Sequence, residues 1–397
     1  MEGSGINRRE FLKLLTVGTA VRALSPDAEI SEPNLQPEID EAIRQTELET
    51  SIINLKLALE EKYKLRLEID KDEIILATSD KNYPGMGELS PAKKLEALEL
   101  LAKTLAEYPT FVISQSGLHS ISILTRPRQG SANETVQGFS YMGHLEAAAQ
   151  EHQTGIVVTY DWNEDSDVPN RYRISQPARQ TELDMKDWTK GSTPEQFITV
   201  IHHELSHHFI DVESTESTPR IQEFRFTEKW ENLFKAHNLL VRSKYIDKTR
   251  IFDQTGKVIG HDYSLVKPPG FAHGYGMFDS GEDRATLAAL LMTQRGLSSE
   301  VIAGDDEQLL NKIKNLKAFY LSLSYGLMDE DYWSKETNYS KGEPSDTLGE
   351  AELQQYFLAK ANVIVKTPYT ESPHKNKVTE ATYSEWQTKL ANIYNIK

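Results

Sequence analysis

The chain has 397 residues, which is long enough for a sizeable core and for two or three subdomains. Its 44 basic and 60 acidic residues give a formal net charge of −16, which argues against electrostatic binding to nucleic acid or to an anionic membrane. No cysteine is present, so disulfides, thiolate nucleophiles and thiolate zinc ligands are excluded. Any bound metal must therefore be held by His, Asp or Glu.

The N-terminal residues resemble an export signal. Residues 7–13 (NRREFLK) resemble the twin-arginine consensus, and a short apolar run follows at 14–21. We assign residues 1–25 to a twin-arginine-like leader and 26–37 to a linker, and we expect export to the periplasm or beyond the cell. The alternative is an ordinary basic amphipathic start on a cytoplasmic protein. No apolar run of about 18 residues occurs, so no transmembrane helix is predicted.

An N-terminal region over 38–88 is predicted next, with a helix at 38–62 and a strand at 65–70 that pairs with 73–77. Ser90 and Pro91 begin a second helix, which ends near Tyr108. The expected strands after it are 111–113, 121–124, 138–142 and 155–160. We interpret 138–142 either as an exposed edge strand or as a plain hairpin arm, and the sequence does not choose between them.

Residues 203–207 read HELSH, the HExxH signature of zinc enzymes. A Thr-Pro-Glu-Gln start at 193–196 and an apolar stripe place this motif on a helix. His203 and His207 then lie on one helical face, where two imidazoles can bind one Zn²⁺ with Glu204 beside them. The chance occurrence of HExxH in a protein without metal is the competing explanation.

Further helices are predicted at 226–238, from Asp279 to about Gln294, at 306–325 and at 379–395. The order of a helix, several strands and then the HExxH helix is typical of an α+β metallopeptidase with a mixed sheet. We place the catalytic domain at 89–300 and a helical C-terminal region at 301–397.

A catalytic zinc takes three protein ligands and one water, so HExxH needs another donor. The class with a third His is excluded, because Ile210 and Glu213 occupy the positions of its Gly and His. Glu282, in the first turn of a later helix, is the preferred third ligand. The remaining alternatives are Glu213, Glu216 and Glu223.

Acidic residues in a first helical turn also stabilise a helix regardless of function, and Ser280 is the N-cap expected for the helix of Glu282. Asp211 follows His207 by one turn, and Asp283 follows Glu282 directly. Either carboxylate is a candidate to accept the outer N–H of a zinc-bound imidazole, or to serve as a solvated or capping acid.

Three features together resemble the gluzincin peptidases related to the catalytic domain of anthrax lethal factor, including a group of zinc-binding metallopeptidases. They are HExxH, Tyr275 seven residues ahead of the Glu282-Asp283 pair, and an upstream helix that ends in Tyr108-Pro109. The resemblance covers roughly residues 50–295. It departs at Arg284 and Thr286, where the family commonly has an aromatic residue and a second Glu.

This resemblance implies a zincin-like fold, one Zn²⁺ per chain and hydrolysis of peptide bonds in a peptide or protein substrate. Glu204 would be the general base for a zinc-activated water, and Tyr275 would donate a hydrogen bond to the oxyanion. Two other functions remain open: an exported zinc-binding protein without peptidase activity, and a cell-wall amidase on the same scaffold.

Overall fold

The computed structural model divides the chain into two units, Met1–Glu47 and Leu48–Lys397. It describes residues 36–69, 73–75, 82–84, 89–124, 128–129, 134–135, 138–143, 153–159, 171–176, 179–184, 194–214, 226–252, 255–261, 263–336 and 350–397. The predicted leader and most of the linker lie outside these ranges. Within them, no helix combines the length and the apolar character needed to cross a bilayer.

A mixed four-stranded sheet lies next to the helix that carries HExxH. Its strand order is β1 (Arg66–Ile69), β4 (Leu118–Leu124), β8 (Gln153–Thr159) and β7 (Gly138–Gly143). The first three strands are parallel, whereas β7 is antiparallel to β8. The described part of the chain is mostly helical with small sheets, which is compatible with the predicted α+β class.

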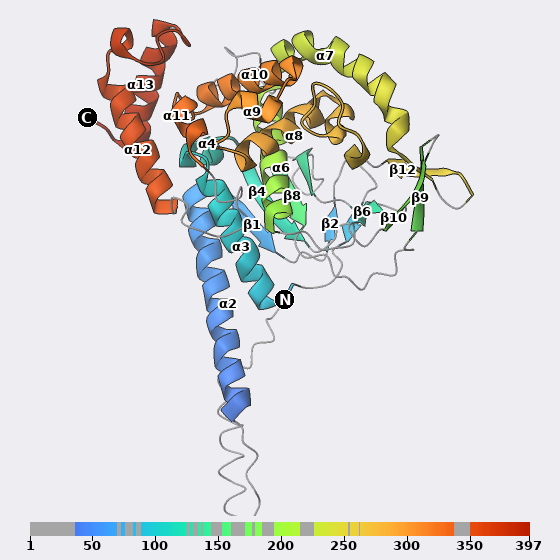
Figure 1. Ribbon diagram of the computed structural model, residues 1–397. Helices are drawn as coiled ribbons and strands as arrows, with labels where there is room; N and C mark the ends of the chain where they lie inside the picture. The colour runs from blue at the N-terminus through green and yellow to red at the C-terminus, as the bar shows by residue number, and fades with distance from the viewer. Residues whose placement is uncertain are drawn as a thin grey trace, which may run out of the picture. The chain divides into compact units, whose positions relative to one another are not determined.

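Among the described strands, β7 lies at the end of this sheet, which agrees with the edge position predicted for 138–142. It is also one arm of an antiparallel pair with β8, the next strand along the chain, so the two interpretations are compatible. Helix α6 (Pro194–Ser214) packs against both β7 and β8. Figure 1 shows α6 alongside β8.

Two predictions near the N-terminal end of this unit are wrong. Strand β2 (Glu73–Ile75) pairs with β3 (Asn82–Pro84) rather than with β1, whose partner is β4. Residues 111–113 belong to the short helix α4 (Thr110–Ser114) and not to a strand. Phe111, Val112 and Ile113 are all buried, and a short apolar run has no periodicity that separates a buried helix from a buried strand.

A second sheet was not predicted. Its order is β10 (Arg179–Asp184), β9 (Arg171–Gln176), β11 (Arg250–Phe252) and β12 (Val258–His261), and a separate small ribbon joins β5 (Arg128–Gln129) to β6 (Glu134–Thr135). The sequences of β9 and β10, RYRISQ and RQTELD, alternate too little in hydrophobicity to indicate strands.

The remaining elements are mainly helical. They are α2 (Gln36–Tyr63), α3 (Pro91–Ala106), α7 (Phe226–Tyr245), α8 (Ser280–Thr293), α9 (Ser299–Ala303), α10 (Glu307–Leu323), α11 (Glu330–Ser334), α12 (Glu350–Lys366) and α13 (Glu380–Tyr394), with short 3₁₀ turns η3 (Ile246–Thr249), η4 (Tyr263–Leu265), η5 (Gly274–Met277) and η7 (Tyr369–Glu371). The predicted helices are present, although α7 extends beyond its predicted end at 238. Helix α12 was not predicted.

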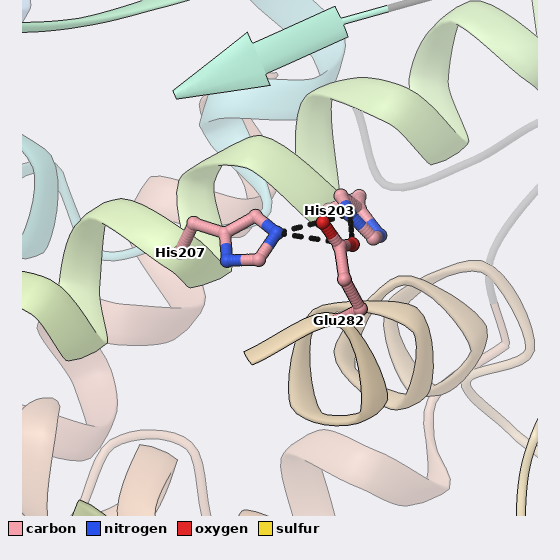
Figure 2. A group of neighbouring side chains, drawn as sticks. All are labelled: His203, His207 and Glu282. Carbon is pink, nitrogen blue, oxygen red and sulfur yellow. Dashed lines mark hydrogen bonds and ion pairs between the residues drawn. The ribbon is translucent and has the colours of Figure 1, made fainter. Parts of the chain in front are cut away.

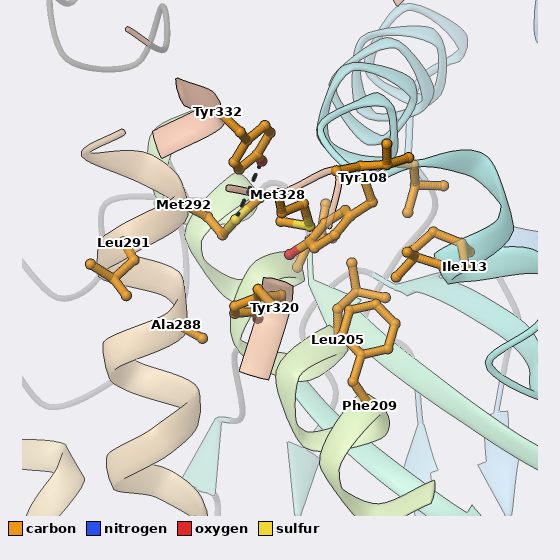
Figure 3. Packing of buried hydrophobic residues seen from close by; sticks show 14 of the residues in the cluster. Tyr108, Ile113, Leu205, Phe209, Ala288, Leu291, Met292, Tyr320, Met328 and Tyr332 are labelled. Atoms are coloured by element: carbon orange, nitrogen blue, oxygen red, sulfur yellow. Dashed lines mark hydrogen bonds between the residues drawn. The ribbon is translucent and has the colours of Figure 1, made fainter. Parts of the chain in front are cut away.

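One hydrophobic core extends from Leu59 to Leu390 and joins the predicted segments 89–300 and 301–397. Figure 3 shows its centre, where Leu205 and Phe209 of α6 pack near Tyr108 and Tyr320. Leu205 and Phe209 are at most 1% exposed, and complete burial of such side chains stabilises a fold by about 1.5–3 kcal/mol each. The core therefore anchors the face of α6 that carries Leu205 and Phe209.

Candidate metal centre

Helix α6 presents His203 and His207 on one face, four residues apart, as the motif predicts. The opposite face carries Ile201, Leu205 and Phe209, which are almost completely buried. Both imidazoles remain partly accessible, with side-chain exposures of 15% and 17%. A buried apolar face thus orients two potential metal ligands toward a partly open space.

Helix α8 brings Glu282 to the same place. The N-cap of α8 is Asp279, whose side chain accepts the Glu282 N–H at 2.9 Å, so the expectation that Ser280 is the cap is wrong by one residue. Ser280 is instead the first helical residue, and its hydroxyl donates to Glu231 of α7. Glu282 therefore lies in the first turn of α8, with its side chain directed at α6 (Figure 2).

The three predicted ligands converge. His203 Nε2 lies 2.9 Å from Glu282 Oε2, His207 Nε2 lies 3.4 Å from the same oxygen, and the two imidazole nitrogens are 3.1 Å apart (Figure 2). Of the alternative third ligands, Glu213 is in α6 but its side chain is not described, and Glu216 and Glu223 lie outside the described residues.

The donor set fits a zinc ion. Two imidazole nitrogens and one carboxylate oxygen match the ligands of catalytic zinc sites. Bonds of about 2.05 Å in tetrahedral geometry place neighbouring ligand atoms about 3.3 Å apart. The observed separations of 2.9, 3.1 and 3.4 Å are close to that value, so a single ion can be reached by all three residues with small side-chain adjustments.

Glu282 is held in its ionised form. Burial raises the pKa of its carboxyl, but hydrogen bonds and charges from His203 and His207 lower it further, so that the net pKa is about 2. A metal ligand must be deprotonated, because the metal competes with the proton for the same lone pair. The Glu282 carboxylate is therefore available to a metal at neutral pH.

Glu204 and Tyr275 lie beside this cluster. Glu204 is 5% exposed, and the Tyr275 ring centroid lies 6.0 Å from that of His203. Burial raises the pKa of the Tyr275 hydroxyl, and the Glu282 and Glu204 carboxylates raise it further, so both acids act on this phenol. The hydroxyl keeps its proton at neutral pH and is able to donate it in a hydrogen bond.

A tight backbone contact fixes the turn that carries Tyr275. A Cβ added at Gly274 would lie 2.0 Å from the Tyr263 carbonyl oxygen, a backbone atom that has no room to move. His273 caps the same 3₁₀ turn, since its Nδ1 accepts the Tyr275 N–H at 3.2 Å. Gly274 and His273 therefore fix the backbone position of Tyr275.

Asp283 does not have the predicted imidazole partner. Its Oδ2 lies 2.7 Å from Lys312 Nζ and accepts a 3.0 Å hydrogen bond from Asn238, while Lys312 also donates to Asn238 at 2.9 Å. Asp283 and Lys312 are at most 1% exposed, and the ammonium lies 4.0 Å from the Phe271 ring centroid. This triangle of buried side chains links α7, α8 and α10 at Asp283, the residue that follows Glu282.

Lys312 and Asn238 were not predicted as partners of Asp283, because long-range side-chain pairing leaves no local pattern in a sequence. The side chain of Asp211, the other candidate for this role, is not described.

His202 and His208, which flank the HExxH motif in the chain, help to position α6. Both are buried, and they bond Tyr108 at 2.8 Å and Ser116 at 3.1 Å, respectively. Burial lowers the pKa of His202 to about 3 and that of His208 to about 4, so both are neutral at physiological pH. They anchor α6 to the region around α3 and α4. In the described part of the chain, no other His joins the metal cluster.

Comparison with known proteins identifies no relative. No family model matches the chain, and neither a curated protein nor a solved structure matches it.

Proposed function

We propose that the protein is a zinc-dependent metallopeptidase of the gluzincin type with a zincin-like fold. The observation that carries this proposal is the convergence of His203 and His207 with Glu282, whose donor atoms all lie within 4.8 Å of one another. Two separate helices supply this His₂Glu set, and the HExxH acid Glu204 lies next to it in the chain.

A bound Zn²⁺ would supply Lewis acidity, polarising a scissile carbonyl and lowering the pKa of water. Glu204 accepts a proton from the attacking water and returns it to the leaving amine. Glu204 is 5% exposed, so the carboxylate that takes the proton is largely shielded from bulk water.

Tyr275 donates a hydrogen bond to the oxyanion of the tetrahedral species. Tyr275 is 37% exposed and its ring lies beside that of His203, so a substrate bound at the cluster can reach it. The phenol is protonated at neutral pH, as a donor in this role requires.

An extended peptide suits the surroundings of the cluster. Among the described strands, β7 ends the sheet and packs against α6, so a substrate strand added there would pair with the backbone of β7. A peptide bound in this way runs alongside the helix that carries His203 and His207. Export through residues 1–25 remains a prediction from the sequence.

Removal of one imidazole tests the metal site. The wild-type protein should bind about one zinc per chain, and His203→Ala should remove nearly all of it, because two donors hold zinc far more weakly than three. Elemental analysis after dialysis measures the zinc content. His119→Ala changes an exposed His on β4 and should leave the zinc content unaltered. Full zinc retention in His203→Ala would rule out this site.

The candidate functions are separated by assaying the protein on three substrates: casein, a broad peptide library and labelled peptidoglycan fragments. Hydrolysis of peptides supports the proposal, whereas selective release of cell-wall fragments supports the amidase. Stoichiometric zinc without cleavage of any of these substrates supports the zinc-binding protein without peptidase activity.

Tyr275→Phe tests the oxyanion donor. Loss of a single donor of this kind should lower kcat by about a hundredfold, with little change in KM and full retention of zinc. Steady-state kinetics on a cleaved peptide measure both constants. Tyr263→Phe alters a neighbouring phenol whose ring centroid lies 5.5 Å from that of Tyr275, and it should change kcat by less than about threefold. Equal losses in the two variants would contradict the assignment.

A further inference from the structure

The C-terminal helices line an open-sided cavity of about 490 Å³ that the proposed peptidase chemistry does not use. Its walls come from α10, the turn before α11, α11 itself and the segment that leads into α13. Three lysines line it: Lys314, Lys317 and Lys377. This concentration of positive charge contrasts with the formal net charge of −16 over the whole chain.

The two acids on the wall do not cancel these charges. Asp329 forms an ion pair with Lys360 and accepts the Tyr332 N–H at 3.1 Å as the N-cap of α11. Glu330 has a side chain that is 69% exposed to water, where its charge is well screened. The cavity wall therefore retains a positive balance.

Lys317 is the most informative of the three lysines. Its side chain is 9% exposed, and its Nζ forms a 3.7 Å ion pair with Oε2 of Glu330, whose own side chain lies mostly in solvent. Burial lowers the pKa of this ammonium, an effect that Glu330 and Glu300 oppose and that Lys377 reinforces. A buried ammonium whose counter-ion lies mostly in solvent would be stabilised further by an anion in the cavity.

The other walls of the cavity provide polar and apolar contacts. Thr379 is the N-cap of α13 and lines the cavity together with Thr382, so the positive end of the α13 dipole is also directed toward it. Trp333, Leu321 and Val378 add apolar surface. The Lys317 ammonium lies 5.6 Å from the Trp333 ring centroid, which places charge and aromatic surface side by side.

We propose that this cavity binds a small organic anion with an apolar body. Its carboxylate or phosphate would contact Lys317 and Lys377, with Lys314 at the rim, and its apolar part would lie on Trp333. The volume suits a molecule of this size, since small-ligand pockets occupy roughly 300–1,000 Å³. None of the residues that line the cavity belongs to the cluster of His203, His207 and Glu282.

Isothermal titration with phenyl phosphate, benzoate and neutral benzamide tests the proposal on the full-length protein. One or both anions should bind saturably at one site, whereas benzamide should bind at least tenfold more weakly. Phenyl phosphate against benzoate distinguishes a phosphate site from a carboxylate site. Lys317→Met keeps most of the unbranched side chain but removes its charge, and it should weaken anion binding by about 10- to 100-fold. Lys366→Met, on the exposed surface of α12, is the matched control and should bind as the wild type does.

An anion can also bind at a metal, so the titration is repeated on His203→Ala. Binding that survives in His203→Ala and is weakened in Lys317→Met supports the cavity. Binding that is lost in His203→Ala and kept in Lys317→Met belongs to the metal centre and overturns the proposal. Absence of saturable binding by both anions also overturns it. Circular dichroism tests whether Lys317→Met is folded. If Lys317→Met does not fold, Lys377→Gln replaces it as the test variant; this substitution is at an exposed position and should cause a smaller loss of anion affinity.

Discussion

Glu204→Gln should retain zinc at the wild-type level and lower peptide hydrolysis by about 10²- to 10⁴-fold, the usual contribution of a general base. The amide of Gln has nearly the shape of the carboxylate but does not accept a proton from water. Glu204 lies outside the His₂Glu set, so the substitution leaves all three donors in place. Zinc content and kcat/KM are measured on the same preparation.

Glu282→Gln is the matched comparison, because it makes the same chemical change at a ligand. It should lower zinc content and hydrolysis together, whereas Glu204→Gln should separate the two. Activity in Glu204→Gln within about threefold of the wild type would show that another group takes the proton. Loss of zinc from Glu204→Gln would instead make Glu204 part of the metal site.

Local signals predicted the elements that carry the candidate site. Pro194 begins α6 as expected, and the i, i+4 spacing of His203 and His207 fixes their common face without reference to the rest of the fold. Glu282 was identified from its position at the start of a helix and from the spacing to Tyr275. The structure brings it within hydrogen-bond distance of His203. Helix starts and residue spacings of this kind can be recognised from short stretches of sequence.

Long-range pairing was not predictable in the same way. Strand β1 pairs with β4, some fifty residues later, although a nearer strand-like segment was available at 73–77. Lys312 is fully buried on α10, yet a lysine in a helix is ordinarily expected to face solvent. Its burial depends on Asp283 and Asn238, which come from two other helices. Only the packed structure brings these three residues together.

The same buried triangle leads to a strong expected effect on stability. Lys312→Met should lower the free energy of unfolding by about 3–5 kcal/mol, because it leaves the Asp283 carboxylate buried without its counter-charge. Lys314→Met, an exposed position on the same helix, should change that free energy by less than about 0.5 kcal/mol. Urea denaturation in the presence of a chelator measures both variants without the contribution of bound zinc.

The double variant Asp283→Asn/Lys312→Met separates the cost of an unpaired charge from the value of the pair itself. It removes both charges and leaves an amide that can hydrogen-bond to Asn238, which contacts both residues in the wild type. Most of the lost stability should therefore return, since neutral replacement of a buried ion pair is often tolerated. A double variant as unstable as Lys312→Met would show that the ion pair itself, and not the unpaired carboxylate, accounts for the loss.

Zinc affinity should also depend on the buried triangle of Asp283, Lys312 and Asn238, because Asp283 directly follows Glu282 in the first turn of α8. Loosening this turn lets the Glu282 carboxylate move away from His203 and His207, and loss of an outer partner typically weakens metal binding by about 10- to 100-fold. Competition with a chromogenic chelator measures the affinity of folded Lys312→Met below its unfolding transition. Unchanged affinity there would mean that contacts with α6 alone position Glu282. A weakened affinity that recovers in the double variant would assign this positioning to the buried triangle of α7, α8 and α10.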